Sequence, residues 1–303
     1  MNNKLRLLNF QSLVNVIDGL GIRYLIIFLF SLLFLTACEE NKPVIPPLLD
    51  VEMEIEEEES EDLVRKVLIE EFTGVRCVNC PQGSEEVENL RAIHGDNLIA
   101  VGIHAGSFSQ PYDESTIDFQ TEAGDAIINF LGVPLGYPSA VISRTVPEGR
   151  TRLQTGQSSW AGLIQQELEK ETVIDLKIEN NFQVADNELV TTIEIIPTED
   201  INEDLRLSVM VVETDIENTQ LTPAGKQDDY LHRHNLRAML TNSTGDALSE
   251  KLLKDTPVER TYNFTIPTAD VPWKPEDVSI IAFVHSGGAT KEVLQVEEVK
   301  ILE

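Results

Sequence analysis

The 303-residue chain has few cysteines, few aromatic side chains and few positive charges. Its three cysteines are too few for a fold held together by a disulfide framework. Lys and Arg total 23 against 52 Asp and Glu, which gives a formal net charge of −29. Because such a charge repels phosphate backbones and anionic lipid headgroups, it argues against a nucleic-acid partner and against polybasic membrane docking. With 42% hydrophobic and 25% charged residues, the chain is otherwise of globular composition, long enough for about two domains.

The amino-terminal residues 1–37 are predicted to be an export signal. Basic residues precede an apolar core at 24–35, which has the length of a signal-peptide core and is short for a membrane-spanning helix. The core ends in Leu-Thr-Ala-Cys at 35–38, which resembles the bacterial lipobox. The resemblance implies that Cys38 is acylated and attaches the mature chain to a membrane through lipid. The alternative is an amino-terminal anchor helix with a chance cysteine.

Residues 38–63 follow as a segment rich in proline and then in acidic side chains, with the run PVIPPLLDVEMEIEEEESED. Prolines favour extended conformations, and neighbouring like charges repel each other. We therefore predict an unpacked tether between the lipid and the folded part, with an acidic binding tail as the alternative.

A Cys-x-x-Cys pair lies between predicted secondary-structure elements. An apolar run over 67–72 indicates a buried strand that ends in a turn. Cys77 and Cys80 come next and open a helical stretch that runs to residue 94. The following residues, 98–103, are almost wholly apolar, as in a parallel strand covered on both faces. This order predicts a β-α-β unit with a dithiol at its turn.

The spacing of the pair suggests redox chemistry. It places Cys77 at the amino terminus of the helix, where the helix dipole favours a thiolate, and Arg76 adds a neighbouring cation. We expect Cys77 to be the exposed, attacking thiol and Cys80 to be the resolving thiol. One alternative is a structural disulfide, although so short a loop stabilises little. The other is half of a zinc site, but no second Cys-x-x-Cys and no matching histidine pattern exist, so neither metal nor cofactor is predicted.

The segment 67–81 resembles the strand and active-site turn of the thioredoxin superfamily. In that superfamily an acidic residue and an aromatic residue often lie six and five positions before the first cysteine, where this chain has Glu71 and Phe72. The resemblance implies that Glu71 is a buried carboxylate beneath the dithiol that relays a proton; the alternative is a strand carboxylate facing solvent. Arg76 replaces the tryptophan usual before the first cysteine, so a redox potential does not carry over.

The same resemblance implies a cis-proline opposite the dithiol. A loop leads through Tyr137 and Pro138 into an apolar strand at 140–143, so we expect Pro138 to be this proline, with Pro134 as the weaker candidate. In the superfamily the proline lies against the active-site sulfurs, and the preceding residue pairs with an extended substrate. The other elements expected in this half are helices at 121–131 and 158–170 and a loop at 105–118 near the site.

From residue 173 onward, short strand-like runs alternate with turn signals, which predicts an antiparallel sandwich. The predicted domains are therefore 64–171 and 172–303. One stretch, 227–240 (QDDYLHRHNLRAML), is unusual. It is predicted to be a strand or loop that joins the domains, with a polar binding surface as the alternative. The expected strands lie at 173–178, 189–196, 205–212, 261–266, 278–284 and 293–301.

The order of the lipobox, TGVRCVNCP, GYPSAVISR and YLHRHNLR resembles that in the Omp28-related outer membrane lipoproteins. The resemblance implies an α/β thioredoxin-like domain followed by an all-β immunoglobulin-like sandwich. It also implies a lipid-anchored protein in the outer membrane of a Gram-negative bacterium, on the periplasmic or the cell-surface face. The leading functional prediction is thiol–disulfide exchange on exported proteins. The rival is a non-catalytic surface binding or adhesion lipoprotein in which the Cys-x-x-Cys is a structural disulfide.

Overall fold

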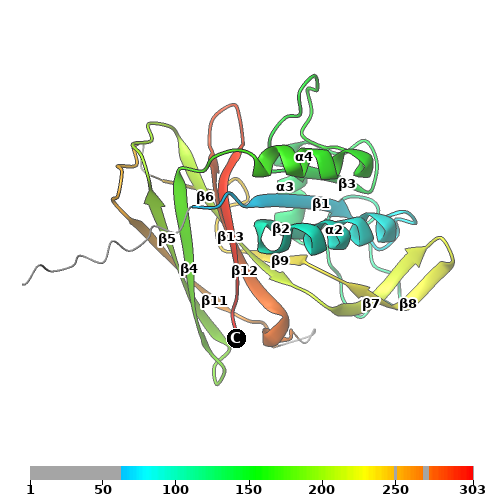
Figure 1. Ribbon diagram of the computed structural model, residues 1–303. Helices are drawn as coiled ribbons and strands as arrows, with labels where there is room; N and C mark the ends of the chain where they lie inside the picture. Colours follow the sequence, from blue (N-terminus) through cyan, green and yellow to red (C-terminus); the bar gives the residue numbers. More distant parts are fainter. Residues whose placement is uncertain (1–62, 249–250, 269–272, 303) are drawn as a thin grey trace, which may run out of the picture. The chain divides into compact units, whose positions relative to one another are not determined.

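The computed structural model describes residues 63–248, 251–268 and 273–302, which Figure 1 shows in colour. The predicted signal peptide, the predicted lipidation site Cys38 and nearly all of the predicted tether lie outside the described residues. Among the residues described, no helix is both long enough and apolar enough to cross a membrane. Strands dominate the secondary structure and helices are few, so the chain has a β-rich fold with several sheets.

The first part of the described chain is a β-α-β unit extended by an antiparallel strand. Strand β1 (Val67–Thr73) pairs in parallel with β2 (Leu98–His104), and helix α2 (Cys80–His94) connects them. Strand β3 (Ser139–Ile142) pairs antiparallel with the other edge of β1. Every residue of these three strands is buried, which is why β1 and β2 read as continuous apolar runs. The predicted strand, helix, strand order is confirmed.

Helices cover both faces of these strands. Helix α3 (Glu122–Leu131) begins after Thr121, whose hydroxyl accepts a hydrogen bond from an amide of the first turn and caps the helix. Leu68 of β1 packs in one apolar cluster with α3. Its neighbour Val67 packs in another cluster with α2 and α4 (Trp160–Leu168), because successive strand side chains point to opposite faces.

The later part of the chain adds a second sheet that packs on the first. Its three strands lie in the order β11-β5-β4, all antiparallel. Side chains on one face of this sheet form an apolar cluster with side chains of β6 and β12, which belong to a larger, eight-stranded sheet. The contact buries one face of each sheet. The predicted antiparallel strands are therefore confirmed. Their bounds are β4 (Ile174–Gln183), β5 (Glu188–Pro197), β6 (Leu205–Glu213), β11 (Val258–Thr265), β12 (Val278–Ser286) and β13 (Val293–Lys300).

One eight-stranded sheet runs through both parts of the described chain, in the order β13-β12-β6-β9-β2-β1-β3, with β10 paired to β6. Strand β9 (Asn235–Met239) makes the connection, because it pairs antiparallel with β6 and in parallel with β2. The amide of Gly102 in β2 donates to the carbonyl of His234 at 2.7 Å. Strands from both sides of residue 171 thus share a sheet, and the division into 64–171 and 172–303 stays a prediction.

Four further strands lie between residues 214 and 247, where only the stretch 227–240 was predicted to be a connecting strand or loop. Two of them form a separate two-stranded sheet that connects β6 to β9. Most of the second strand of this hairpin is polar and exposed, so it carries no apolar alternation that marks a half-buried strand. The strands are β7 (Ile216–Thr222), β8 (Gly225–His232), β9 (Asn235–Met239) and β10 (Asp246–Ala247).

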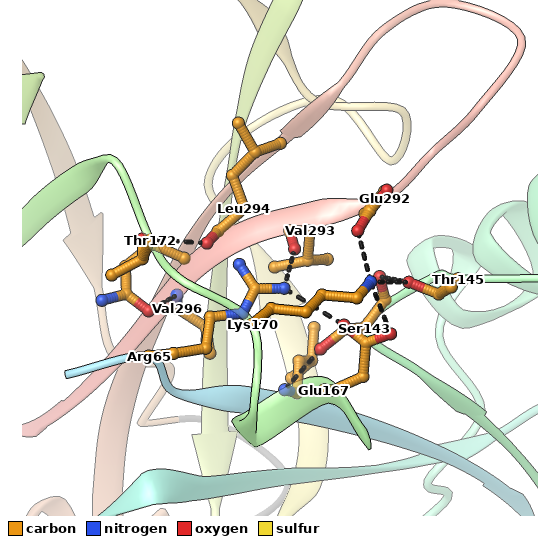
Figure 2. A network of polar contacts seen from close by, with 12 residues as sticks. Arg65, Ser143, Thr145, Glu167, Lys170, Thr172, Glu292, Val293, Leu294 and Val296 are labelled. Carbon is orange, nitrogen blue, oxygen red and sulfur yellow. Dashed lines mark hydrogen bonds and ion pairs between the residues drawn. The ribbon is translucent and has the colours of Figure 1, made fainter. Parts of the chain in front are cut away.

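A network of polar contacts ties the start of the described chain and the end of α4 to β13 (Figure 2). Buried Arg65 donates through Nη2 to Glu167 at 3.2 Å and to the carbonyl of Val293 at 2.6 Å. Lys170 pairs with Glu167 at 2.8 Å and with Glu292 at 2.5 Å. Because every carboxylate here has a cation beside it, the charges at this join are compensated within the fold.

Glu70 and Arg144 form an ion pair inside the large sheet. Arg144 donates through Nε and Nη2 to the two carboxylate oxygens at 2.9 and 2.7 Å, and both side chains are fully buried. The guanidinium also lies 4.7 Å from the ring centroid of Phe283. Glu70 therefore faces away from α2, on the side opposite to Glu71, as the strand periodicity predicts.

Replacement of Glu70 by glutamine should destabilise the protein strongly, because it leaves the buried Arg144 charge without its counter-charge. We expect the free energy of unfolding, measured by urea denaturation, to fall by about 3–5 kcal/mol. The matched control is Glu297→Gln, which breaks the half-exposed pair with Lys66 and should cost much less. Equal losses in the two variants would contradict the structural importance of the buried pair.

Candidate functional site

The two neighbouring cysteines form a disulfide at the start of α2. Cys77 and Cys80 have Cα atoms 5.3 Å apart, and Cys80 is the first residue of the helix. Pro81 follows, at a position where the missing amide hydrogen leaves no helical hydrogen bond unmade. The turn is closed by the amide of Cys77, which donates to the carbonyl of Gly74 at 3.0 Å. The pair lies at a strand-to-helix turn, as predicted, but the helix begins at Cys80, so Cys77 lies before the helix and not at its amino terminus.

The expectation that Cys77 is exposed is wrong. Cys77 is only 3% exposed and Cys80 1%. The β7–β8 hairpin lies over the turn: Gln220 donates through Nε2 to the carbonyl of Cys77 at 3.1 Å, and the amide of Leu221 donates to the carbonyl of Val75 at 2.8 Å. Gln220 lies 143 residues after Cys77, so no pattern in the sequence around the cysteines indicates that the hairpin covers them.

Arg76 is exposed and holds the neighbouring loop against the turn. Its guanidinium donates to the carbonyls of Gln110 and Pro111 at 2.7 and 2.6 Å, and it lies 4.2 Å from the ring centroid of Tyr112. Its own amide donates to the carbonyl of Phe108 at 2.8 Å. The loop expected near the site is therefore there, and Arg76 anchors it. Its predicted effect on the Cys77 thiol stays a prediction.

Glu71 is buried beneath the helix, with 5% of its surface exposed, and does not face solvent. Its carboxyl accepts a hydrogen bond from the Ser84 hydroxyl at 3.2 Å. Desolvation raises the pKa of Glu71 to about 8, and the charge of Glu88 adds to the rise, while the Ser84 hydrogen bond opposes it. At neutral pH this carboxyl therefore carries a proton for most of the time.

The peptide bond between Tyr137 and Pro138 is cis, as expected for Pro138 rather than Pro134. Pro138 packs against the first turn of α2 at Gly83. A Cβ atom on Gly83 would lie 2.7 Å from both Pro138 Cβ and Glu71 Oε1, which is too close for any side chain. Glycine therefore lets the helix approach the proline and the buried carboxyl together, three residues after Cys80.

A cavity of about 150 Å³ lies next to the disulfide, between α2, β2 and residues 230–235. Glu71 and Cys80 both line it, so the buried carboxyl and the second cysteine face one enclosed space. Ser84, His104, Tyr230 and His232 also line the cavity, although nothing in their sequence positions indicated that they would lie beside the cysteines.

Three buried histidines line the cavity, His104, His232 and His234. Burial lowers the pKa of His232 to about 4 and brings the pKa of His104 well below its ordinary value of 6.5. Their ring centroids are 5.6 Å apart, and Phe119 lies against both. Within the described residues, His104 Nδ1 and His232 Nε2 have no hydrogen-bond partner, and no group of three His, Cys, Asp or Glu side chains is arranged to hold a metal ion.

The unusual stretch 227–240 both joins the two parts of the chain and lines the cavity. It forms most of β8, a tight turn and β9, so the favoured interpretation as a connecting strand describes its structure correctly. At the turn, His234 contacts Glu88 of α2 at 2.8 Å, and this hydrogen bond lowers the pKa of the Glu88 carboxyl. In the sequence, this stretch was notable for its many histidine, arginine and tyrosine residues. The spacing of these residues did not indicate that they would contact helix α2.

These observations define a β-rich protein with an oxidised Cys-x-x-Cys at a helix start, beside a buried protonated carboxyl and a cis-proline. Residues 125–303 match the family model described as Outer membrane protein Omp28. The chain belongs to this family of outer membrane proteins, which confirms the family resemblance seen in the sequence. The matched region begins after the cysteines, so family membership does not by itself assign them a role.

The chain is similar to solved structures, among them the following two. HBP35 of Porphyromonas gingivalis is similar with a TM-score of 0.63 and 19% identity, over 79% of this chain and 76% of that chain, which shows a shared fold. A domain of the outer membrane lipoprotein Omp28 of Porphyromonas gingivalis matches with a TM-score of 0.30 and 17% identity, over 43% of this chain and 88% of that chain. A comparison with curated protein sequences finds no match.

Glu71 should make stability depend on pH. The folded protein keeps this proton up to about pH 8, whereas the unfolded carboxyl releases it near 4.5, so the folded state binds more protons between these values. Stability should therefore fall as pH rises through that window, by roughly 1.4 kcal/mol per unit at most. Glu71→Gln should remove this loss, as measured by urea unfolding at pH 5 and pH 8. The exposed Glu85→Gln should leave the pH dependence unchanged; a wild-type-like slope in Glu71→Gln would contradict the burial argument.

The hairpin contact should control how fast the disulfide is reduced. Gln220→Ala removes the hydrogen bond to the Cys77 carbonyl, so the turn should open more often and dithiothreitol should reduce the disulfide about two- to tenfold faster. The control is Gln227→Ala, on the opposite strand of the same hairpin and exposed, which should leave the rate unchanged. If both variants react at the wild-type rate, the hairpin does not limit access.

Proposed function

We propose that this protein is a lipid-anchored outer-membrane protein that exchanges disulfides with exported proteins through Cys77 and Cys80. Glu71 carries the argument, because it is a mostly protonated carboxyl in the same cavity as Cys80. Burying a carboxyl with one hydroxyl partner costs stability, and a disulfide closing so short a loop returns little. Neither the buried carboxyl nor the short disulfide loop adds much to the stability of the fold. Together, however, they supply a pair of thiols with a proton source.

The exchange can start from the disulfide that the structure contains. A substrate thiolate attacks Cys77 Sγ, the Cys77–Cys80 bond breaks, and Cys80 leaves with the bonding electrons. Glu71 then gives its proton to the Cys80 thiolate. A second substrate thiolate attacks the substrate sulfur of the mixed disulfide, and Cys77 leaves as a thiolate. Two electrons pass from the substrate to the protein, so the substrate gains a disulfide; the reverse sequence reduces one.

A thioredoxin-like domain is the architecture we propose for this chemistry. The parallel β1-α2-β2 unit, the antiparallel β3 and the cis bond before Pro138 support it. In such a domain Pro138 docks the substrate backbone beside the sulfurs, and Arg76 supplies a cation next to Cys77. For the later strands we propose an immunoglobulin-like sandwich, supported by two antiparallel sheets around one apolar cluster.

Access to Cys77 requires movement of the β7–β8 hairpin. The hairpin pairs with no other sheet among the described residues and is held to the turn through Gln220 and Leu221. The hairpin is also held to the neighbouring loop by Asn218, which bonds to Thr116 and Ile117, and by Lys226, which pairs with Glu114. Opening requires that all these contacts break, and none of them belongs to the pairing of the eight-stranded sheet. Acylated Cys38 would hold the protein at the membrane, where exported proteins pass.

Trapping of mixed disulfides tests the proposal. In Cys80→Ala, Cys77 can attack a substrate disulfide but nothing resolves the product, so covalent partners should accumulate. They should appear on non-reducing gels after the full chain is purified from its own membranes, and should disappear with reductant. Cys77→Ala should trap none. If neither variant captures a partner, exchange is not the function.

The burial of Cys77 favours a second candidate, a non-catalytic binding or adhesion lipoprotein with a structural disulfide. The equilibrium reduction potential distinguishes the two. A structural pair should stay oxidised in glutathione buffers poised near about −300 mV, whereas an exchanging pair should equilibrate at a higher potential.

A further inference from the structure

A second hollow, larger than the disulfide cavity, lies elsewhere on the described chain. It has a volume of about 720 Å³ and lies between the end of α3, the loop 144–154 that follows β3, and residues 289–292 between β12 and β13. It shares no lining residue with the disulfide cavity. Nothing in the exchange chemistry uses this cleft.

The cleft is basic, although the chain carries a net charge of −29. Arg144, Arg152 and Lys291 line it. Among the described residues, neither Arg152 nor Lys291 forms an ion pair with a carboxylate. The one acidic side chain in the lining is Glu292, which Lys170 already holds at 2.5 Å (Figure 2). An excess of positive charge therefore faces this cleft, although the composition of the chain predicts a mostly negative surface.

Arg144 lies in the wall of the cleft, and one N–H group of its guanidinium has no hydrogen-bond partner among the described residues. Glu70 holds its Nε and Nη2 atoms, which fixes the plane of the guanidinium, and its buried Nη1 has no hydrogen-bond partner among the described residues. A buried unpaired donor costs free energy unless something satisfies it. Polar side chains complete the wall: Thr145, Thr151, Gln154 and Thr290.

We propose that this cleft binds a small oxyanion, a carboxylate or a phosphate. The exposed guanidinium of Arg152 matches the planar edge of either group, and the fully buried guanidinium of Arg144, held in place by Glu70, adds one unsatisfied donor to the wall. Arg152 is exposed and Lys291 half-buried, so both can turn toward an anion at the mouth of the cleft. The exposed hydroxyl of Thr151 then supplies a further hydrogen bond to the oxygens.

Isothermal titration of the full chain tests the site, with inorganic phosphate in one arm and glucuronate in the other, at constant ionic strength set with chloride. Saturable binding of either anion is expected, and the arm that binds more tightly identifies the natural group as phosphate or carboxylate. Arg152→Ala combined with Lys291→Ala should weaken binding about tenfold or more, since charge-assisted hydrogen bonds are lost.

The matched control is Lys177→Ala combined with Lys254→Ala, which removes the same charge from exposed positions outside the cleft. It should leave the affinity unchanged. An equal loss in both double variants would mean that the anion follows the general field of the protein, and the proposal would be wrong. Absence of binding of both anions at millimolar concentration in the wild-type chain would also overturn it.

Discussion

The pairing of β9 between β6 and β2 is the contact on which the rest of the arrangement depends. It joins two sets of strands into one eight-stranded sheet through the register of Gly102 opposite Asn235. Because β6 and β9 are neighbours, the chain between them has to leave the sheet and return, and it does so as the β7–β8 hairpin. That hairpin reaches the Cys-x-x-Cys turn, so the disulfide is covered by residues such as Gln220, which lies 143 residues after Cys77.

Two adjacent acidic residues of β1 show how surroundings decide the role of a carboxyl. Glu70 is met by the guanidinium of Arg144 in a two-point contact, so its burial is compensated by an opposite charge. Glu71, one residue later and on the other face, meets only the hydroxyl of Ser84. A hydroxyl does not offset the loss of water around a charge, so desolvation dominates and the pKa of Glu71 rises to about 8. The same residue type is thus an ion-pair partner in one case and a carboxyl with a raised pKa in the cavity lined by Cys80 in the other.

Sequence reasoning succeeded where burial leaves a local trace. Strands β1 and β2 are buried on both faces, so most of their residues are apolar. The polar residues between them indicate the turn and the start of the helix. The cis peptide before Pro138 was implied by the family resemblance, and the structure contains it. Reasoning failed for the β7–β8 hairpin, because much of it is polar and exposed and its position depends on hydrogen bonds to a distant turn. The mistaken exposure of Cys77 follows from that one omission.

The sequence by itself determined the local chemistry: a two-residue spacing lets the cysteine sulfurs meet, a helix begins close to them, and an acidic side chain lies in the strand that precedes them. It also determined family membership, because the order of segments is a property of the chain. Only the tertiary structure decided that Cys77 is covered, that Gly83 brings Glu71 and Pro138 together, and that Arg144, Arg152 and Lys291 line one cleft. The physical reason is distance along the chain: spacing governs groups a few residues apart, whereas exposure and electrostatics are set by side chains that meet only when the sheet closes.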